Sequence, residues 1–235
     1  MNKKYSKKKT LALAITLILM CSNSMQVHAA EKECSKSNRM YCEVDKLIAE
    51  VDKYALIQDA KNEIMDERVS ADLLSNVTAT VDFTPIEGVE GIDFNIYSTV
   101  QKVGDFVNDK GETSTLYVTA AAAIEPTIDR GYNKKYDVEA YIYIYWIDNL
   151  GTNNELYAIS VSWNPHGLEV SNRTATYGVV NITTLFYDES TDISIYQNDY
   201  YKNVHGEYTG FILGCSSSIY VTNLGTVTCY AQTTF

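Results

Sequence analysis

The feature that most constrains the fold is a regular alternation of apolar and polar side chains in segments 136–147 and 155–163. Successive side chains of a β-strand point to opposite faces, so each segment sorts into two sets. The residues between the segments, 148–154, are rich in Asp, Asn and Gly, which favour turns. We therefore predict two antiparallel strands that share one apolar face.

The alternation also predicts the parity of the pairing. The apolar sets are Val138, Ala140, Ile142, Ile144 and Trp146 in the first segment, and Tyr157, Ile159, Val161 and Trp163 in the second. Only registers that pair an even-numbered residue with an odd-numbered one bring these sets together, since a slip of one residue exchanges the faces. Ile142 and Ile144 are then expected beside Ile159 and Val161.

The opposite face of the first segment carries Tyr141, Tyr143 and Tyr145. Tyrosine offers rigid, amphipathic contact area at low entropic cost, so we predict that these three residues form a ligand-binding platform. The alternative is that tyrosine simply suits a half-buried strand, where its ring packs and its hydroxyl reaches solvent.

The rest of the chain indicates an all-β fold, an antiparallel β-sandwich of meander or Greek-key type over residues 76–235. Ten short strands are expected, near 77–84, 93–103, 114–124, 136–147, 155–163, 174–187, 192–198, 207–214, 217–222 and 226–233. The turns between them are too short for helical crossovers, which disfavours a parallel sheet.

Residues 30–75 are expected to hold a polar leader and an amphipathic helix. The apolar residues Val44, Leu47, Ile48, Val51 and Ala55 recur at helical spacing. The helix could end near Ile57 or continue to about Glu67. It is expected either to pack over an edge or face of the β domain, or to be a detachable element such as a propeptide or a partner-binding helix.

Residues 1–29 have the pattern of a secretory signal peptide of a bacterial type. Five lysines precede an apolar stretch from Leu11 to Met20, and Val27-His28-Ala29 offers a cleavage site before Ala30. The apolar stretch is too short to span a bilayer well. We therefore expect a secreted, extracellular protein.

Four cysteines remain after removal of this segment: Cys34, Cys42, Cys215 and Cys229. An even number in an exported chain favours disulfides, and the two close pairs favour Cys34–Cys42 and Cys215–Cys229 among three possible connectivities. In a tight hairpin turning at 223–225, Cys215 and Cys229 would not lie opposite each other, so this second bridge needs a bulge or a link between layers. The spacing of these four cysteines does not match that of a zinc site, which disfavours zinc binding.

The net charge of the chain disfavours nucleic acids and anionic membranes as partners. The chain without its first 29 residues carries 14 basic and 30 acidic residues, a net charge of −16. Phosphate backbones and anionic membranes repel such a chain, so we expect no nucleic-acid partner and no stable membrane insertion.

The sequence contains no motif that indicates a reaction. It lacks His-Glu-x-x-His and Gly-x-Ser-x-Gly. Two histidines, His166 and His205, fall in expected turns. The spacing between these histidines and the serines Ser216, Ser217 and Ser218 is not characteristic of a catalytic site. No metal site or cofactor is expected, although the loops 105–112 and 188–192 hold oxygen donors that suit a structural calcium ion.

The most consistent hypothesis is a secreted, non-enzymatic recognition protein for an unknown surface ligand: a cell wall, a glycan or a host surface. Its oligomeric state is open. One alternative is a secreted hydrolase with an unrecognised carboxylate site. The other is a β-pore-forming, membrane-active toxin, for which the alternation in Thr174–Tyr196 is the best candidate segment.

Overall fold

The computed structural model describes residues 39–70, 73, 76–124, 138–148, 154–180, 187–192 and 198–235. The chain divides into two units between Cys42 and Glu43, and all of the described strands belong to the second. The elements are α2 (Arg39–Ala49), α3 (Lys53–Lys61), β1 (Val77–Pro85), β2 (Asn95–Val107), β3 (Thr113–Ile124), β4 (Glu139–Asp148), β5 (Asn154–Asn164), β6 (Val170–Val180), β7 (Tyr187–Asp192), β8 (Asp199–Gly210), β9 (Ile212–Val221) and β10 (Gly225–Thr234).

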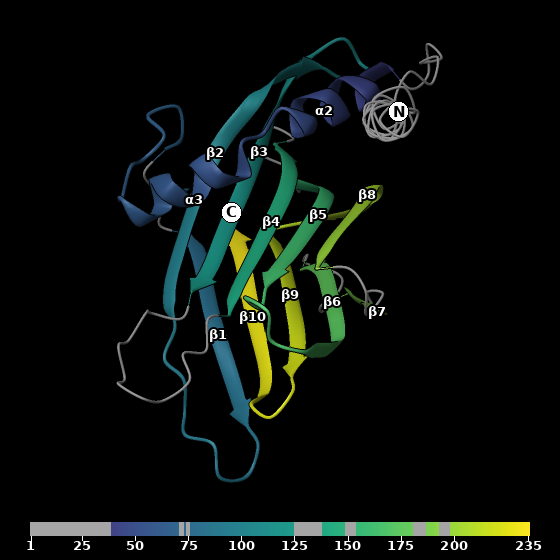
Figure 1. The fold of residues 1–235 in the computed structure, drawn as a ribbon. Coiled ribbons are helices and arrows are strands. Elements are labelled where there is room, and N and C mark those ends of the chain that lie inside the picture. Colours follow the sequence, from purple (N-terminus) through teal and green to yellow (C-terminus); the bar gives the residue numbers. More distant parts are fainter. Residues whose placement is uncertain are drawn as a thin grey trace, which may run out of the picture. The chain divides into compact units, whose positions relative to one another are not determined.

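The strands form two five-stranded sheets that face each other (Figure 1). The front sheet has the order β2-β3-β4-β5-β8, and the back sheet has the order β1-β10-β9-β6-β7. All of the described strand pairs are antiparallel. The prediction of a mostly antiparallel, all-β protein is confirmed, and the front sheet is a meander through its first four strands.

The predicted pairing of β4 with β5 is confirmed. Ile142 lies opposite Val161 and Ile144 opposite Ile159. The pairing shifts between Tyr145 and Trp146, because β5 carries one extra residue, Tyr157, at a β-bulge. The bulge reverses the parity beyond it, so Leu156 joins the core between the sheets, whereas Tyr157 was expected there.

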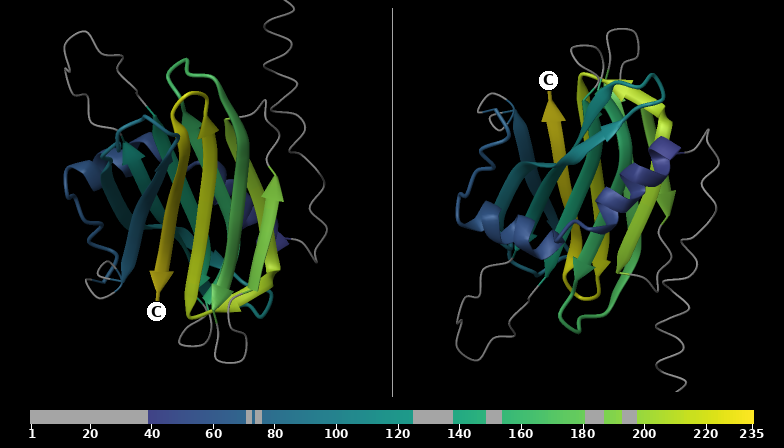
Figure 2. Two further views of the ribbon diagram at one scale, coloured as in Figure 1. Left: turned by 90° about the horizontal axis from the view of Figure 1, so that it is seen from below. Right: turned by 90° about the horizontal axis from the view of Figure 1, so that it is seen from above.

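The core between the sheets contains two buried tryptophans whose indole N–H groups find hydroxyl partners. Trp163 Nε1 donates to Ser217 Oγ of the back sheet at 2.9 Å. Trp146 Nε1 donates to Thr119 Oγ1 at 3.1 Å, and that hydroxyl forms a short hydrogen bond with Thr233 Oγ1 of the back sheet. The two views of Figure 2 look onto opposite faces of the sandwich, and in each of them one sheet lies behind the other. Paired polar groups therefore join the sheets within an otherwise apolar core.

The last third of the chain differs from the sequence prediction. A break was expected near 215–216, but β9 runs without interruption from Ile212 to Val221. The chain turns earlier, between β8 and β9, and His205 lies in β8 where a turn was expected. Residues 188–192, expected as a turn with calcium ligands, belong to strand β7. Strand β9 continues through Gly214 and Ser216 because it is paired on both sides, with β10 and with β6.

The helical residues from Glu43 to Lys61, called here the helical segment, lie across the outer face of the front sheet (Figures 1 and 2). Helix α3 begins after Asp52, whose Oδ1 accepts the N–H of Ala55 at 3.0 Å as an N-cap. The segment is thus two helices joined at Glu50–Asp52, where one continuous helix was expected. Among the described helices, none has the length and apolar character needed to cross a membrane.

The predicted disulfide between Cys215 and Cys229 is absent, and both residues are free, buried thiols. In the β9–β10 register Cys215 lies opposite Ala231 and Cys229 opposite Ser217. The two cysteines are therefore diagonal neighbours, whose separation is too large for a bridge. Burial raises the pKa of both thiols, that of Cys229 to about 12. Cys34 lies outside the described residues, so its bridge to Cys42 stays a prediction.

Candidate functional site

The three tyrosines of β4 share the outer face of the front sheet, as the alternation predicts. Their neighbours on the adjoining strands are small or apolar. In register, Tyr141 lies between Ala122 and Ser162, Tyr143 between Ala120 and Ser160, and Tyr145 between Val118 and Ala158. The rings therefore form a ridge along β4, with shorter side chains beside it on β3 and β5. We call Tyr141, Tyr143 and Tyr145 the tyrosine ridge.

Lys53 of the helical segment contacts the middle of the tyrosine ridge. Its ammonium group donates to Ser160 Oγ at 2.8 Å and lies 5.1 Å from the centre of the Tyr143 ring. The Tyr143 hydroxyl donates to the carbonyl oxygen of Lys53 at 3.4 Å. Burial of the ammonium group lowers the pKa of Lys53. The negative charge of Asp199 acts in the opposite direction.

A second polar contact joins α2 to the far end of the face. The hydroxyl of Tyr157, the bulge residue of β5, donates to Asp45 Oδ1 at 3.0 Å. Asn203 of β8 donates to the same oxygen at 3.2 Å. Burial raises the pKa of Tyr157, so this phenol remains a hydrogen-bond donor at any physiological pH.

Tyr145 is fully buried, yet its hydroxyl has no hydrogen-bond partner among the described residues. The exposed fraction of Tyr143 is only 4%. Two of the three rings are therefore buried in this structure, in which the helical segment lies over this face of the sheet (Figure 2), and the ligand-binding platform stays a prediction. Only Tyr141, at the open end of the ridge, is partly exposed.

Replacing Tyr145 by phenylalanine is expected to raise the free energy of unfolding by about 1 kcal/mol, because a buried hydroxyl without a partner costs free energy. The matched control is Tyr157→Phe, which breaks the bond to Asp45 and is expected to lower it by about 1–2 kcal/mol. Urea-denaturation midpoints at constant m-value measure both changes. Equal losses in the two variants would contradict the assignment of Tyr145 as unpaired.

At the open end, three side chains gather around one carboxylate oxygen of Glu139. Glu139 Oε2 accepts hydrogen bonds from the Tyr141 hydroxyl at 2.8 Å and from Asn164 Nδ2 at 3.0 Å. The Nε2 atom of His166 lies 3.3 Å from the same oxygen. We call Glu139, Tyr141, Asn164 and His166 the Glu139 cluster. Its members are fixed relative to one another while their side chains stay partly exposed.

The turn after β5 holds the cluster in place. Asn164 Oδ1 accepts the backbone N–H of His166 at 3.2 Å, and Leu168 N–H donates to the carbonyl of Pro165 at 2.9 Å. His166 adopts a positive φ of 46°, which the tight turn requires. Partial burial and the bond to Glu139 raise the pKa of Tyr141, so its phenol stays protonated.

Sequence reasoning identified the tyrosine ridge but missed the rest of the site. Glu139 lies two residues before Tyr141 and so shares its face, and Asn164 lies opposite Glu139 in the strand register. The exact register would have brought these two together, but the alternation predicted only its parity. Nothing in the local sequence indicated Lys53 or Asp45, which come from a distant segment.

The residues considered for calcium binding and for nucleophilic catalysis lie elsewhere in the fold. Asp105, in the first suggested calcium loop, accepts hydrogen bonds from Lys102 and Thr115. Ser217 faces the core, where it donates to the carbonyl of Thr174, so it is not beside His166. Within the described ranges, no group of three or more His, Cys, Asp or Glu side chains could hold a metal ion.

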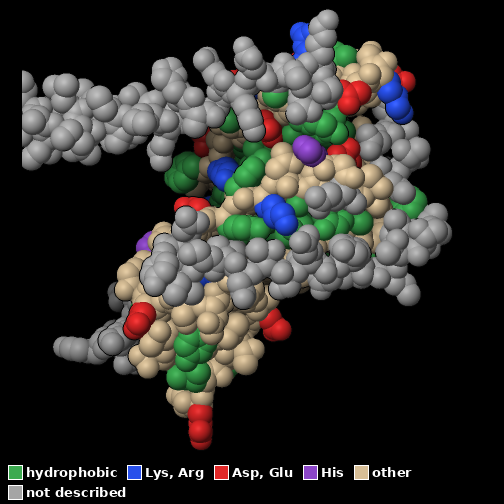
Figure 3. All heavy atoms as spheres, turned by 90° about the vertical axis from the view of Figure 1, so that its right-hand side faces the viewer, with side chains coloured by type: hydrophobic (Ala, Val, Ile, Leu, Met, Phe, Trp, Pro, Cys, Tyr) green, Lys and Arg blue, Asp and Glu red, His purple; other side chains and the backbone are tan. Residues whose placement is uncertain are grey.

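The charge on the visible surface is dispersed. On the face shown in Figure 3, acidic side chains lie in several separate places and do not form one patch. Comparison of the chain with protein-family models, with curated proteins and with solved structures finds no match. The functional argument therefore depends on the geometry of the tyrosine ridge and the Glu139 cluster.

Proposed function

We propose that this is a secreted, non-enzymatic recognition protein that binds a hydroxyl-rich surface ligand, such as a cell-wall glycan, at the Glu139 cluster. The observation that carries the proposal is the convergence of Tyr141, Asn164 and His166 on one carboxylate oxygen. An aromatic ring beside fixed donors and acceptors is suited to a polar ligand with apolar ring faces. Because the cluster is fixed before binding, little entropy is lost on association.

The test is co-sedimentation of the purified protein with insoluble cell-wall material. Wild-type protein is expected to pellet saturably, and Tyr141→Ala to bind at least tenfold more weakly, as for a central aromatic contact. The matched control is Tyr220→Ala, because Tyr220 is a partly exposed tyrosine on β9 of the back sheet. Equal binding by Tyr141→Ala and wild type would remove the cluster from the site.

If wild-type protein stayed wholly in the supernatant, the proposal of wall binding would be wrong. Vesicle leakage would then test the membrane-active alternative, for which β6 and β7 form an antiparallel pair at one edge of the back sheet.

A hydrolase is the second candidate, and one observation favours it. The contact of 3.3 Å between Glu139 and His166 places a carboxylate beside an imidazole at a partly exposed position. A carboxylate can hold an imidazole in the orientation that a general acid or base requires. A hydrolase would release soluble fragments from the wall material during the same sedimentation experiment, whereas a binding protein would not.

A further inference from the structure

The helical segment is attached to the front sheet by a mixture of apolar and polar contacts. Its apolar anchors are Val44, Ile48, Leu56 and Ile57, all of which are buried. None of them belongs to the core between the sheets. The segment that carries them lies over the outer face of the front sheet, where α3 contacts β2 and β3 (Figure 2). The polar contacts are those of Asp45 and Lys53. The segment therefore has its own hydrophobic layer, separate from the core of the sandwich.

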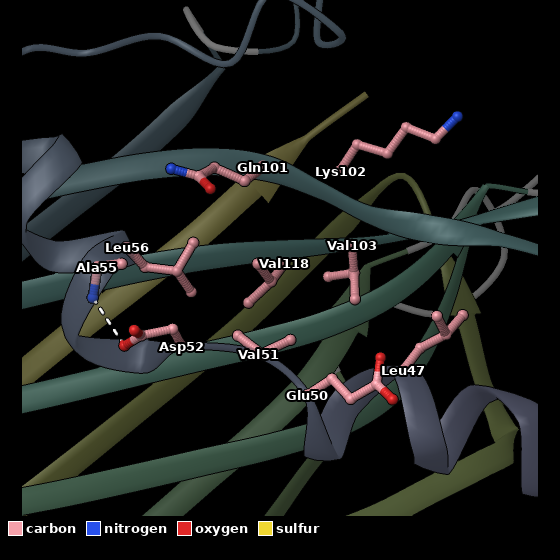
Figure 4. Close-up of a pocket in the computed structure, with 10 residues that line it drawn as sticks. All are labelled: Leu47, Glu50, Val51, Asp52, Ala55, Leu56, Gln101, Lys102, Val103 and Val118. Atoms are coloured by element: carbon pink, nitrogen blue, oxygen red, sulfur yellow. Dashed lines mark hydrogen bonds between the residues drawn. The ribbon is translucent and has the colours of Figure 1, made fainter.

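This layer is imperfectly packed in two places. A pocket of about 280 Å³ lies where α2 meets α3, between the helical segment and strands β2 and β3 (Figure 4). Its lining includes the apolar side chains Leu47, Val51 and Val118. The second defect is the unpartnered hydroxyl of Tyr145. Missing packing contacts and an unpaired hydroxyl both weaken the attachment of the segment to the sheet.

The surface beneath the segment continues the Glu139 cluster. The tyrosine ridge runs along β4 from Tyr141, which belongs to the cluster, to Tyr143 and Tyr145 under the helices. The residues beside the ridge on β3 and β5 are small or apolar, as described above. Once uncovered, these rings would offer a continuous aromatic strip with hydroxyl groups at its edge, the surface that suits an extended chain of sugar rings.

We propose that the helical segment is a removable cover, and that a hydroxyl-rich polymer bound at the Glu139 cluster extends onto Tyr143 and Tyr145 when the segment leaves the sheet. This inference rests on the proposed function, since it adds a second, covered part to the same binding site. The apolar anchors keep the segment closed in the absence of ligand. A ligand that binds the open form better shifts the population toward it.

The close approach of α2 to β2 allows the segment to be locked shut. A Cβ atom built at Gly104 would lie 3.7 Å from Leu47 Cγ and 2.9 Å from its Cδ2. Cysteines at both positions are therefore within reach of a disulfide. Neither residue belongs to the tyrosine ridge or the Glu139 cluster. The variant is L47C/G104C, and the single variant G104C, which cannot form the bridge, is the control.

Oxidised L47C/G104C is expected to bind insoluble wall material at least tenfold more weakly than the same protein after reduction. Oxidised and reduced G104C should bind alike. If the locked and reduced forms of the double variant bound equally, the removable cover would be ruled out while the proposed function stood.

Thiol labelling tests the opening without any ligand. Ser160 is 3% exposed beneath Lys53, so a Ser160→Cys thiol reacts only when the segment moves away. We expect this thiol to be labelled at least tenfold faster than Cys215 and Cys229, which lie between the sheets. We also expect labelling to slow at least tenfold in the oxidised lock. Labelling as slow as that of the core cysteines would overturn the inference, even if the wild type failed to bind wall material.

Discussion

Replacing Trp146 by alanine is expected to lower the free energy of unfolding by about 3–5 kcal/mol. The indole is 1% exposed, stacks on Tyr117 with ring centroids 4.5 Å apart, and meets the edge of Phe235 at 4.5 Å. Truncation leaves a cavity whose walls come from both sheets, and two paired sheets cannot close around it. A urea-denaturation midpoint that falls at constant m-value measures the loss.

The control is Trp146→Phe, which keeps an aromatic ring against Tyr117 and Phe235 but removes the N–H that donates to Thr119. It is expected to cost about 1–2 kcal/mol, because one buried hydroxyl loses a donor while most of the packing remains. If phenylalanine cost as much as alanine, the hydrogen bond to Thr119 and not the ring packing would account for the stabilisation by Trp146, contrary to our account.

Replacing Gly225 by alanine is expected to lower the free energy of unfolding by about 2–5 kcal/mol. Gly225 begins β10 with a φ of 141°, a conformation that L side chains rarely adopt. A Cβ atom there would lie 2.2 Å from the carbonyl oxygen of Thr84 and 2.8 Å from Pro85 Cα. Both are backbone atoms of β1, so relief requires β1 and β10 to separate. Thermal and urea denaturation both report this loss.

Gly111→Ala is the matched control for Gly225→Ala. Gly111 also has a positive φ, of 80°, but a Cβ atom there would have no neighbour within 4 Å. Its replacement adds backbone strain alone and is expected to cost about 1 kcal/mol. The difference between the two variants measures the steric conflict with β1. Equal losses would mean that the contact between β10 and β1 is loose.

The alternation of side chains determined the β fold, the parity of the register that places Ile142 and Ile144 beside Ile159 and Val161, and the common face of the tyrosine ridge. These features depend on the period of two along a strand, which is local and can be counted in the sequence. The bulge at Tyr157 could not be predicted, because an extra residue in one strand is set by the partner strands on both sides. The diagonal placement of Cys215 and Cys229 likewise depends on the register of the β9–β10 pair.

The candidate site was only partly predictable. Alternation assigns a side chain to a face of a sheet, but it does not say what packs on that face. Tyr143 is buried because a segment about 90 residues earlier in the chain lies over it, as the contact with Lys53 shows. Val118, the register partner of Tyr145, lines the pocket against the same segment. The Glu139 cluster also required the tertiary structure, since the β5–β6 turn brings His166 back to the start of β4. The sequence by itself therefore determined which residues share a face, and the long-range packing decided which of them a ligand can reach.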